Sequence, residues 1–157
     1  MDIESRNKIL TIILGLIIIG LTFWLYDSLV TPYKQVKEQQ ALKEQVRQRL
    51  LDTKDALIQY QTRNDEFPPT EGGLDSLVNF LKTDSMMIVL GDSLFGRTFN
   101  VYNPDSLVYS PRPPYPKFEY TLNDTLRPNI YLLEDPGSND AIGSLERTTM
   151  RNAPNWN

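Results

Sequence analysis

The chain has 157 residues, with 20 acidic against 16 basic side chains, and it contains neither cysteine nor histidine. Without those two residue types, a disulfide framework, thiolate chemistry, a Ser-His-Asp triad, a typical zinc site and histidine acid-base catalysis are excluded. Residues 28–64 hold 7 basic and 4 acidic side chains, a net charge of +3, whereas the chain from residue 65 onward holds 7 basic and 13 acidic, a net charge of −6. The acidic C-terminal part argues against nucleic acid as a partner, because phosphate binding needs clustered Lys and Arg.

An apolar segment near the N-terminus reads ILTIILGLIIIGLTFWLY from Ile9 to Tyr26, with no charged residue inside it. At a helical rise of about 1.5 Å per residue it covers roughly 27 Å, close to the ~30 Å hydrocarbon thickness of a bilayer. Residues 9–30 are therefore predicted to form a transmembrane anchor. A cleavable signal peptide is the alternative, but the run is longer than a usual signal-peptide core and no small-x-small cleavage pattern follows it.

The orientation of this anchor is predicted from flanking charge and from length. Arg6 and Lys8 precede the apolar segment, and Lys34 and Lys37 follow it, so the positive-inside bias nearly cancels. Because the N-terminal tail (residues 1–8) is short and long following domains translocate whatever their charge, we expect a cytoplasmic N-terminus. The anchor is then expected in a bacterial inner membrane, with the C-terminal head in the periplasm. The lysines after the anchor are placed to contact membrane lipid, although a solvated helix face is the simpler explanation.

Beyond the anchor, Pro32 is expected to kink or restart the helix. Residues 33–63 then predict an amphipathic stalk helix, because apolar side chains recur at steps of three and four: Leu42, Val46, Leu50, Thr53, Leu57 and Tyr60. The stripe is too short and too mixed to predict a coiled coil. We expect its far half to pack on a small α+β head formed by residues 64–143.

Within the head, a turn at 64–70 leads to a short helix in which Leu74, Leu77, Val78 and Leu81 share one face. The apolar run 86–90 predicts a buried strand, and 98–102 predicts a weaker one. Alternating residues at 118–123 face a second run at 130–133 across the turn NDTLRP, which predicts an antiparallel hairpin.

Two further segments are predicted to lack regular secondary structure. The proline-rich stretch SPRPPYP at 110–116 predicts an extended polyproline II connector. The polar tail, residues 144–157, is expected to be mobile unless Trp156 docks on the head or on a partner.

The stretch DALIQYQTRNDEFPPTEGGLDSLVNFL, from Asp55 to Leu81, contains an aromatic-proline pair followed by a Gly-Leu-x-x-Leu-Val segment directly after an amphipathic helix. In this arrangement the chain resembles the major pseudopilins of type II secretion systems and their type IV pilin relatives, over roughly residues 50–144. The resemblance implies a pilin-like head, with the stalk helix packed on a small antiparallel sheet. The chain departs from that family because its apolar segment contains no acidic residue, and neither Gly15 nor Gly20 is followed by a prepilin processing sequence. Processing and standard filament assembly are therefore not expected.

The segment LEDPGSNDAIGS, from Leu133 to Ser144, resembles the loop that can bind calcium in major pseudopilins. The ligands implied by this resemblance are the carbonyl of Leu133 and the side chains of Asp135, Ser138, Asn139 and Asp140, which offer the hard oxygen atoms that Ca²⁺ prefers. The same residue types also build ordinary turns, so the alternatives are a Ca²⁺ site or no cofactor at all.

Three functions remain open from the sequence. Catalysis is not expected, because the clustered acids Glu134, Asp135 and Asp140 lie in a polar turn and the chain has neither a glycine-rich phosphate loop nor a base-activated nucleophile. We expect a structural or accessory subunit of a membrane complex, with partner subunits contacted through the transmembrane and stalk helices. The alternatives are a genuine pseudopilin-like subunit of a secretion or fibre system and, with less support, a ligand-binding sensor.

Overall fold

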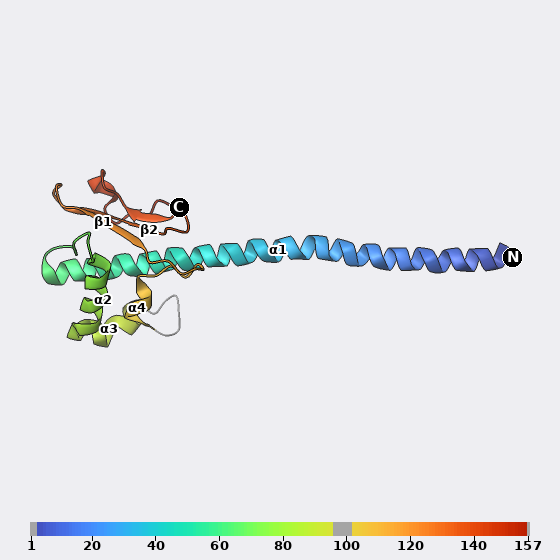
Figure 1. The fold of residues 1–157 in the computed structure, drawn as a ribbon, viewed down its shortest axis with the longest axis horizontal. Helices are drawn as coiled ribbons and strands as arrows, with labels where there is room; N and C mark the ends of the chain where they lie inside the picture. Colours follow the sequence, from blue (N-terminus) through green and yellow to red (C-terminus); the bar gives the residue numbers. More distant parts are fainter. Residues whose placement is uncertain (1–2, 96–101, 157) are drawn as a thin grey trace. The chain divides into compact units, whose positions relative to one another are not determined.

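The computed structural model describes residues 3–95 and 102–156, and its fold is α+β as predicted (Figure 1). Its first element, α1 (Ile3–Asn64), is a single helix of 62 residues. The helix runs through Pro32 without interruption, so the restart expected there is wrong. Proline lacks the N–H donor and so removes one hydrogen bond of the helix. The hydrogen bonds of the helical residues on both sides of Pro32 are enough to continue the helix through it.

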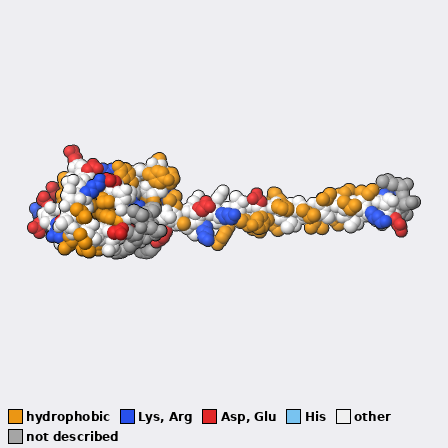
Figure 2. Space-filling model, turned by 90° about the horizontal axis from the view of Figure 1, so that it is seen from below, with side chains coloured by type: hydrophobic (Ala, Val, Ile, Leu, Met, Phe, Trp, Pro, Cys, Tyr) orange, Lys and Arg blue, Asp and Glu red, His pale blue; other side chains and the backbone are white. Residues whose placement is uncertain are grey.

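The chain divides into two compact units, residues 1–41 and residues 42–157. The first unit consists of the N-terminal part of α1, which is the one helix in the described part of the chain that is long and apolar enough to cross a membrane. Its large apolar side chains are exposed to solvent in the absence of a bilayer, from Ile9 to Val36. Figure 2 shows these side chains along the helix. A helix that is apolar on all sides is typical of a membrane span.

The second unit is built around the C-terminal half of α1, whose apolar stripe is buried as predicted. Val46, Leu50 and Leu57 are fully inaccessible to solvent, and Thr53 is buried between them. Helix α2 (Gly73–Thr83) packs its own apolar face into the same core through its buried leucines: Leu74, Leu77 and Leu81. The 3.6-residue periodicity therefore identified the faces on which both helices pack.

A three-stranded antiparallel sheet contributes the other side of this core. Its strands are β1 (Glu119–Asn123), β2 (Ile130–Glu134) and β3 (Ala141–Gly143), in the order β1-β2-β3. The predicted hairpin of β1 and β2 is confirmed, with Tyr120 opposite Leu133 in the register.

Other parts of the chain form hydrogen bonds to both edges of the sheet. The N–H of Leu122 in β1 donates to the hydroxyl of Thr70 over 3.0 Å. At the other edge, the N–H of Gly143 donates to the carbonyl of Ala153, and the N–H of Asn155 donates to that of Ala141, both over 3.0 Å. The final residues thus pair with β3, and Trp156 is half-buried against the core. Trp156 therefore docks on the head, which is the condition under which the polar tail was expected to be ordered.

The strand predicted at 86–90 is wrong, because these residues belong to helix α3 (Ser85–Phe95). The carboxylate of Asp84 accepts hydrogen bonds from the backbone N–H groups of Met86 and Met87 over 2.9 and 3.0 Å. Asp84 therefore caps the N-terminus of a helix. A short apolar run alone does not distinguish a helix from a buried strand. The weaker strand predicted at 98–102 lies outside the described residues except for Tyr102.

The proline-rich stretch is a tight reversal, so the extended polyproline II connector predicted at 110–116 is also wrong. The N–H of Tyr115 donates to the carbonyl of Arg112 over 2.7 Å, and that of Ser110 donates to the carbonyl of Pro116 over 2.8 Å. The reversal follows a short helix, α4 (Pro104–Leu107), and precedes β1. The last element is a 3₁₀ turn, η1 (Thr148–Met150).

Candidate functional site

The predicted calcium loop connects β2 with β3, and its residues are only partly gathered. The hydroxyl of Ser138 donates to the carboxylate of Asp135 over 2.7 Å. The carbonyl of Asn139 instead accepts a hydrogen bond from the side chain of Asn155 over 2.6 Å. Leu133 lies within β2, where it pairs with Ile142. The structure therefore brings Asp135 and Ser138 together, while other members of the predicted ligand set are held by neighbouring elements.

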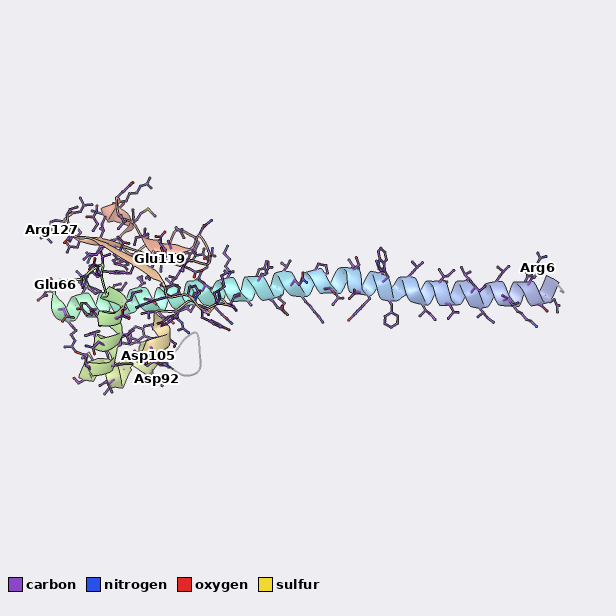
Figure 3. All side chains as sticks on the ribbon, in the orientation of Figure 1. Arg6, Glu66, Asp92, Asp105, Glu119 and Arg127 are labelled. Atoms are coloured by element: carbon purple, nitrogen blue, oxygen red, sulfur yellow. The ribbon has the colours of Figure 1, made fainter. Side chains whose placement is uncertain are left out.

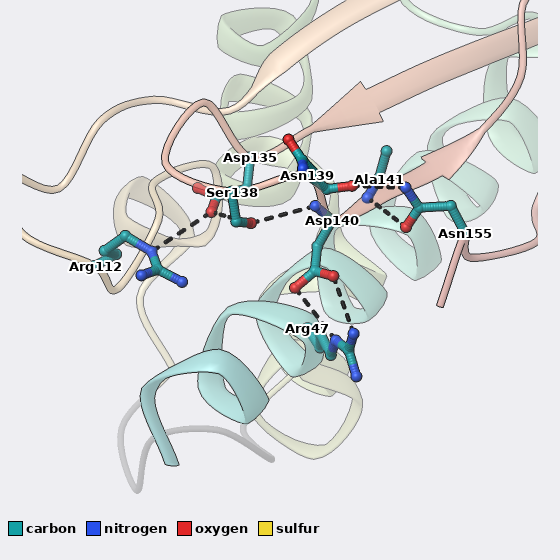
Figure 4. Close-up of polar contacts among 8 residues, drawn as sticks. All are labelled: Arg47, Arg112, Asp135, Ser138, Asn139, Asp140, Ala141 and Asn155. Atoms are coloured by element: carbon teal, nitrogen blue, oxygen red, sulfur yellow. Dashed lines mark hydrogen bonds and ion pairs between the residues drawn. The ribbon is translucent and has the colours of Figure 1, made fainter. Parts of the chain in front are cut away.

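Each carboxylate of this loop faces an arginine from another part of the head (Figure 4). Asp140 accepts two hydrogen bonds from Arg47 of α1, from Nε over 3.2 Å and from Nη2 over 3.1 Å. The Nε atom of Arg112, in the proline-rich reversal, lies 3.8 Å from the fully buried side chain of Asp135. The arginines supply positive charge at the positions where the resemblance to pseudopilins places a cation.

The Asp135 contact is incomplete among the residues that the structure describes. Its Oδ1 atom is buried there without a hydrogen-bond partner, and so is the Nε atom of Arg112. An ion pair at 3.8 Å without a direct hydrogen bond is weaker than the bidentate pair of Asp140. Calcium binding by this loop stays a prediction.

Sequence reasoning did not find Arg47 or Arg112 as partners of the loop. Arg47 lies 93 positions before Asp140, on a different element of the head. Arg47 also stacks its guanidinium group 5.1 Å from the centre of the Trp156 ring. These contacts join residues that are far apart in the sequence, so no local pattern encodes them.

A second candidate site is an open pocket of about 480 Å³ between α1 and the segment 106–115. Tyr109 and Tyr115 form its aromatic walls and are 43% and 60% exposed. Arg49 lies at its base and donates hydrogen bonds to the carbonyl and hydroxyl oxygens of Ser106. Burial lowers the pKa of Arg49, and the carboxylate of Asp52 partly offsets this effect. The pocket therefore combines apolar walls with a partly desolvated cation.

The backbone at Tyr115 is unusual. Its φ angle is +62°, in the left-handed region that bulky side chains rarely adopt. Such a conformation costs on the order of 1 kcal/mol and persists only where surrounding contacts enforce it. Here the hydrogen bond to Arg112 and the pairing of Ser110 with Pro116 hold the reversal.

A third feature is the outer face of α3, which is apolar and exposed. Ile88 and Val89 are 61% and 75% exposed, and Met86 and Leu90 lie beside them. Figure 3 shows Asp92 on the same helix, and α3 carries no basic residue. A contiguous exposed aliphatic surface is characteristic of proteins that bind other macromolecules.

Comparison of the chain with models of protein families, with curated proteins and with solved structures gave no match. The structure defines an α+β protein with one long N-terminal helix, part of which is apolar enough to cross a membrane. The resemblance to pseudopilins stays a prediction.

Proposed function

We propose that this protein is a non-catalytic, membrane-anchored accessory subunit of a bacterial inner-membrane complex, with a pseudopilin-like head on the periplasmic side. The observation that carries the proposal is α1, because one helix supplies both the apolar segment and the central element of the head core. The apolar segment and the central helix of the head are thus parts of one secondary-structure element. This arrangement suits a protein that holds an interaction surface near a membrane.

Two features of the head support a role in protein binding. Helix α3 presents exposed aliphatic side chains, and the tyrosine-lined pocket presents large amphipathic rings. Tyrosine is enriched in protein interfaces because its ring combines apolar area with a polar tip. These surfaces offer binding area outside the membrane.

The alternative is a genuine pseudopilin-like subunit of a secretion or fibre system. The observation that favours it is the packing of the C-terminal half of α1 on a small antiparallel sheet. The absence of an acidic residue from the apolar segment 9–26 favours the accessory subunit. Recovery of the chain in discrete detergent-solubilised complexes would support the accessory role, whereas recovery in sedimentable fibres would support the alternative.

The anchor is tested by alkaline carbonate extraction of membranes that contain the full chain. We expect the chain to remain in the membrane pellet and to be released by detergent. Ile17→Arg places a charge in the middle of the apolar segment, at a cost of about 3 kcal/mol for insertion, and should release a fraction of the chain. Gln40→Arg is the matched control outside the segment. Full extraction of the wild-type chain by carbonate would overturn the proposed anchor.

The orientation is tested by labelling, for which the natural absence of cysteine is an advantage. Single-cysteine variants Arg6→Cys and Glu119→Cys place a thiol at exposed positions that precede and follow the apolar segment in the sequence (both residues are labelled in Figure 3). With the outer membrane permeabilised, a membrane-impermeant maleimide should label Glu119→Cys and spare Arg6→Cys. The reverse pattern would contradict the periplasmic head.

A partner is tested by purification from membranes in mild detergent, followed by identification of the proteins that accompany the chain. We expect one or more integral membrane proteins in stoichiometric amounts. Isolation of the chain as a lone monomer under these conditions would contradict the accessory-subunit proposal.

A further inference from the structure

One tripeptide recurs through the sequence: an aspartate, then a serine or threonine, then a leucine or methionine. Five of the nine serines and one threonine occur in this setting. Aspartate makes up 12 of the 157 residues, so by chance it would precede fewer than one serine in ten. The six tripeptides are Asp27-Ser28-Leu29, Asp75-Ser76-Leu77, Asp84-Ser85-Met86, Asp92-Ser93-Leu94, Asp105-Ser106-Leu107 and Asp124-Thr125-Leu126.

The six tripeptides share no secondary structure. The first lies inside α1, the second in the first turn of α2, and the third at the N-terminus of α3. The fourth lies near the C-terminus of α3, the fifth in α4, and the last in the loop between β1 and β2. Figure 3 labels Asp92 and Asp105, which begin the fourth and fifth. Helix capping and the helix dipole favour an aspartate at the start of a helix, but not inside α1 or late in α3.

No single folding requirement therefore explains the repetition, and recognition of the tripeptide by an enzyme does. Such an enzyme reads the extended chain before the head folds, because most of the tripeptides become helical. The group that all six share for chemistry is a hydroxyl, which is the nucleophile of many group transfers. The head is then the acceptor in a transfer reaction.

The aspartate beside each hydroxyl indicates which group is transferred. Transfer of a sugar passes through a transition state with positive charge on the sugar ring, and a neighbouring carboxylate stabilises that charge. Transfer of a phosphoryl group brings an anion to the hydroxyl, and a neighbouring carboxylate repels it. Phosphoryl transfer also needs a nucleoside triphosphate, which is supplied in the cytoplasm and not on the periplasmic side. Both considerations favour a sugar.

We propose that the head carries O-linked sugars on hydroxyl groups of these tripeptides. The inference rests on the proposed function only in that the head is periplasmic. The donor is a sugar linked through phosphate to a lipid of the same membrane. The hydroxyl oxygen forms a bond to C1 of the sugar, and the bond from C1 to the phosphate oxygen breaks with its electron pair on the phosphate. The hydroxyl proton passes to a base of the transferring enzyme.

The folded head has room for a sugar at three of the six hydroxyl residues. Ser85 and Ser93 are exposed on α3, and Thr125 is exposed in the loop between β1 and β2. The hydroxyl of Thr125 donates to the side chain of Asn123 over 2.6 Å, which is a contact within its own hairpin. Sugars are bulky and hydrophilic, so these exposed positions accept them without a change of the core. A protein partner of α3 must then bind beside the sugars.

The other three hydroxyl residues are less suited to a bulky group. Ser76 is half-buried, and Ser28 follows the apolar segment directly. Ser106 is exposed, but its hydroxyl donates to the carbonyl of Asn103 over 3.0 Å and accepts a hydrogen bond from Arg49. A sugar on Ser106 would disrupt these contacts.

The test begins with the full chain purified in detergent from the membranes of the cells that naturally produce it. Mass spectrometry of its peptides, with fragmentation that keeps the modification on its residue, should place sugar on Ser85, Ser93 and Thr125. Ser144 is an internal control, because Leu145 follows it but glycine precedes it. Thr148 and Thr149 are exposed controls without a preceding aspartate. All three controls should be unmodified.

Two substitutions test the aspartate itself at exposed positions. Asp92→Asn keeps an oxygen acceptor for the N–H of Tyr102 and should abolish the sugar on Ser93, while Ser85 keeps its own. Thr148→Asp places an aspartate before Thr149 and Met150 and should create a new modified residue at Thr149. Thr148→Asn is its matched control and should leave Thr149 unmodified.

Absence of sugar from all three residues overturns the inference, and so does phosphate in its place. Full modification of Ser93 in Asp92→Asn, or equal outcomes for Thr148→Asp and Thr148→Asn, also overturns it. The cysteine labelling locates the head independently. A head that is labelled from outside but carries no sugar refutes this inference alone, whereas a cytoplasmic head without sugar refutes the proposed location as well.

Discussion

The ion pair between Arg47 and Asp140 is expected to contribute measurably to the stability of the head. The side chains are 19% and 8% exposed, and the two hydrogen bonds between them measure 3.1 and 3.2 Å. Breaking a fully buried pair costs about 3–5 kcal/mol, and an exposed pair contributes less than about 1 kcal/mol. For this half-buried, bidentate pair, Asp140→Asn should cost about 2 kcal/mol, or roughly 8 °C in Tm.

A double-mutant cycle of Arg47→Gln and Asp140→Asn separates the pair from the other contacts of each residue. This matters for Arg47, because its guanidinium also stacks on the ring of Trp156. Urea unfolding of the full chain in micelles can be followed by Trp156 fluorescence in a Trp24→Phe background, since these are the two tryptophans. We expect a coupling energy of about 1.5 kcal/mol with an unchanged denaturant slope.

The exposed pair of Lys82 and Asp105 is the matched control in the same molecule. Its side chains are 47% and 61% exposed, although its N–O distance of 2.6 Å is shorter. The same cycle there should give a coupling energy below about 0.5 kcal/mol. Equal coupling at the two pairs would refute the reasoning that burial and bidentate geometry, and not distance, determine the contribution.

Three further outcomes are expected from the structure. Because arginines already face both carboxylates of the loop at 135–140, the Tm should agree within about 1 °C between chelator and 5 mM Ca²⁺, and a clear rise with Ca²⁺ would instead establish the metal site. Leu57→Ala should destabilise the head by about 3 kcal/mol in urea unfolding, whereas Leu14→Ala in the apolar segment should leave the head unchanged. Burial raises the pKa of Tyr120 and of Tyr131 well above the ordinary value of 10. The folded state therefore holds these two protons more tightly, and stability is complete below pH 10 and falls above it by up to about 2.7 kcal/mol per pH unit. Unfolding followed at 295 nm checks this, and a flat stability between pH 9 and 11 would contradict it.

The strongest sequence patterns predicted the corresponding elements correctly. The steps of three and four through Leu50 and Leu57 identified the buried face of α1, and the alternation around Tyr120 identified the hairpin. Both patterns arise from burial on one face of an element, so the sequence alone reveals them. The apolar length of residues 9–26 likewise identified the helix that can cross a membrane.

The errors arose where the pattern was short or where a single side chain decided the structure. The apolar run in α3 fits a strand or a helix, and the capping carboxylate of Asp84 selects the helix. Strand β3 has only three residues, too few to show an alternating pattern, and it pairs with β2 and with the C-terminal segment. The partners of the loop at 135–140 could not be predicted, because Arg47 and Asp140 are 93 positions apart in the sequence.

The C-terminal residues restrict how copies of this protein can assemble through the sheet. Thr70 bonds to the outer edge of β1, and residues 153–155 pair along β3. An unpaired edge invites strand addition from another molecule, and the pairing of residues 153–155 removes that opportunity at the β3 edge. Strand addition beside β3 therefore requires that the C-terminal residues first detach from it.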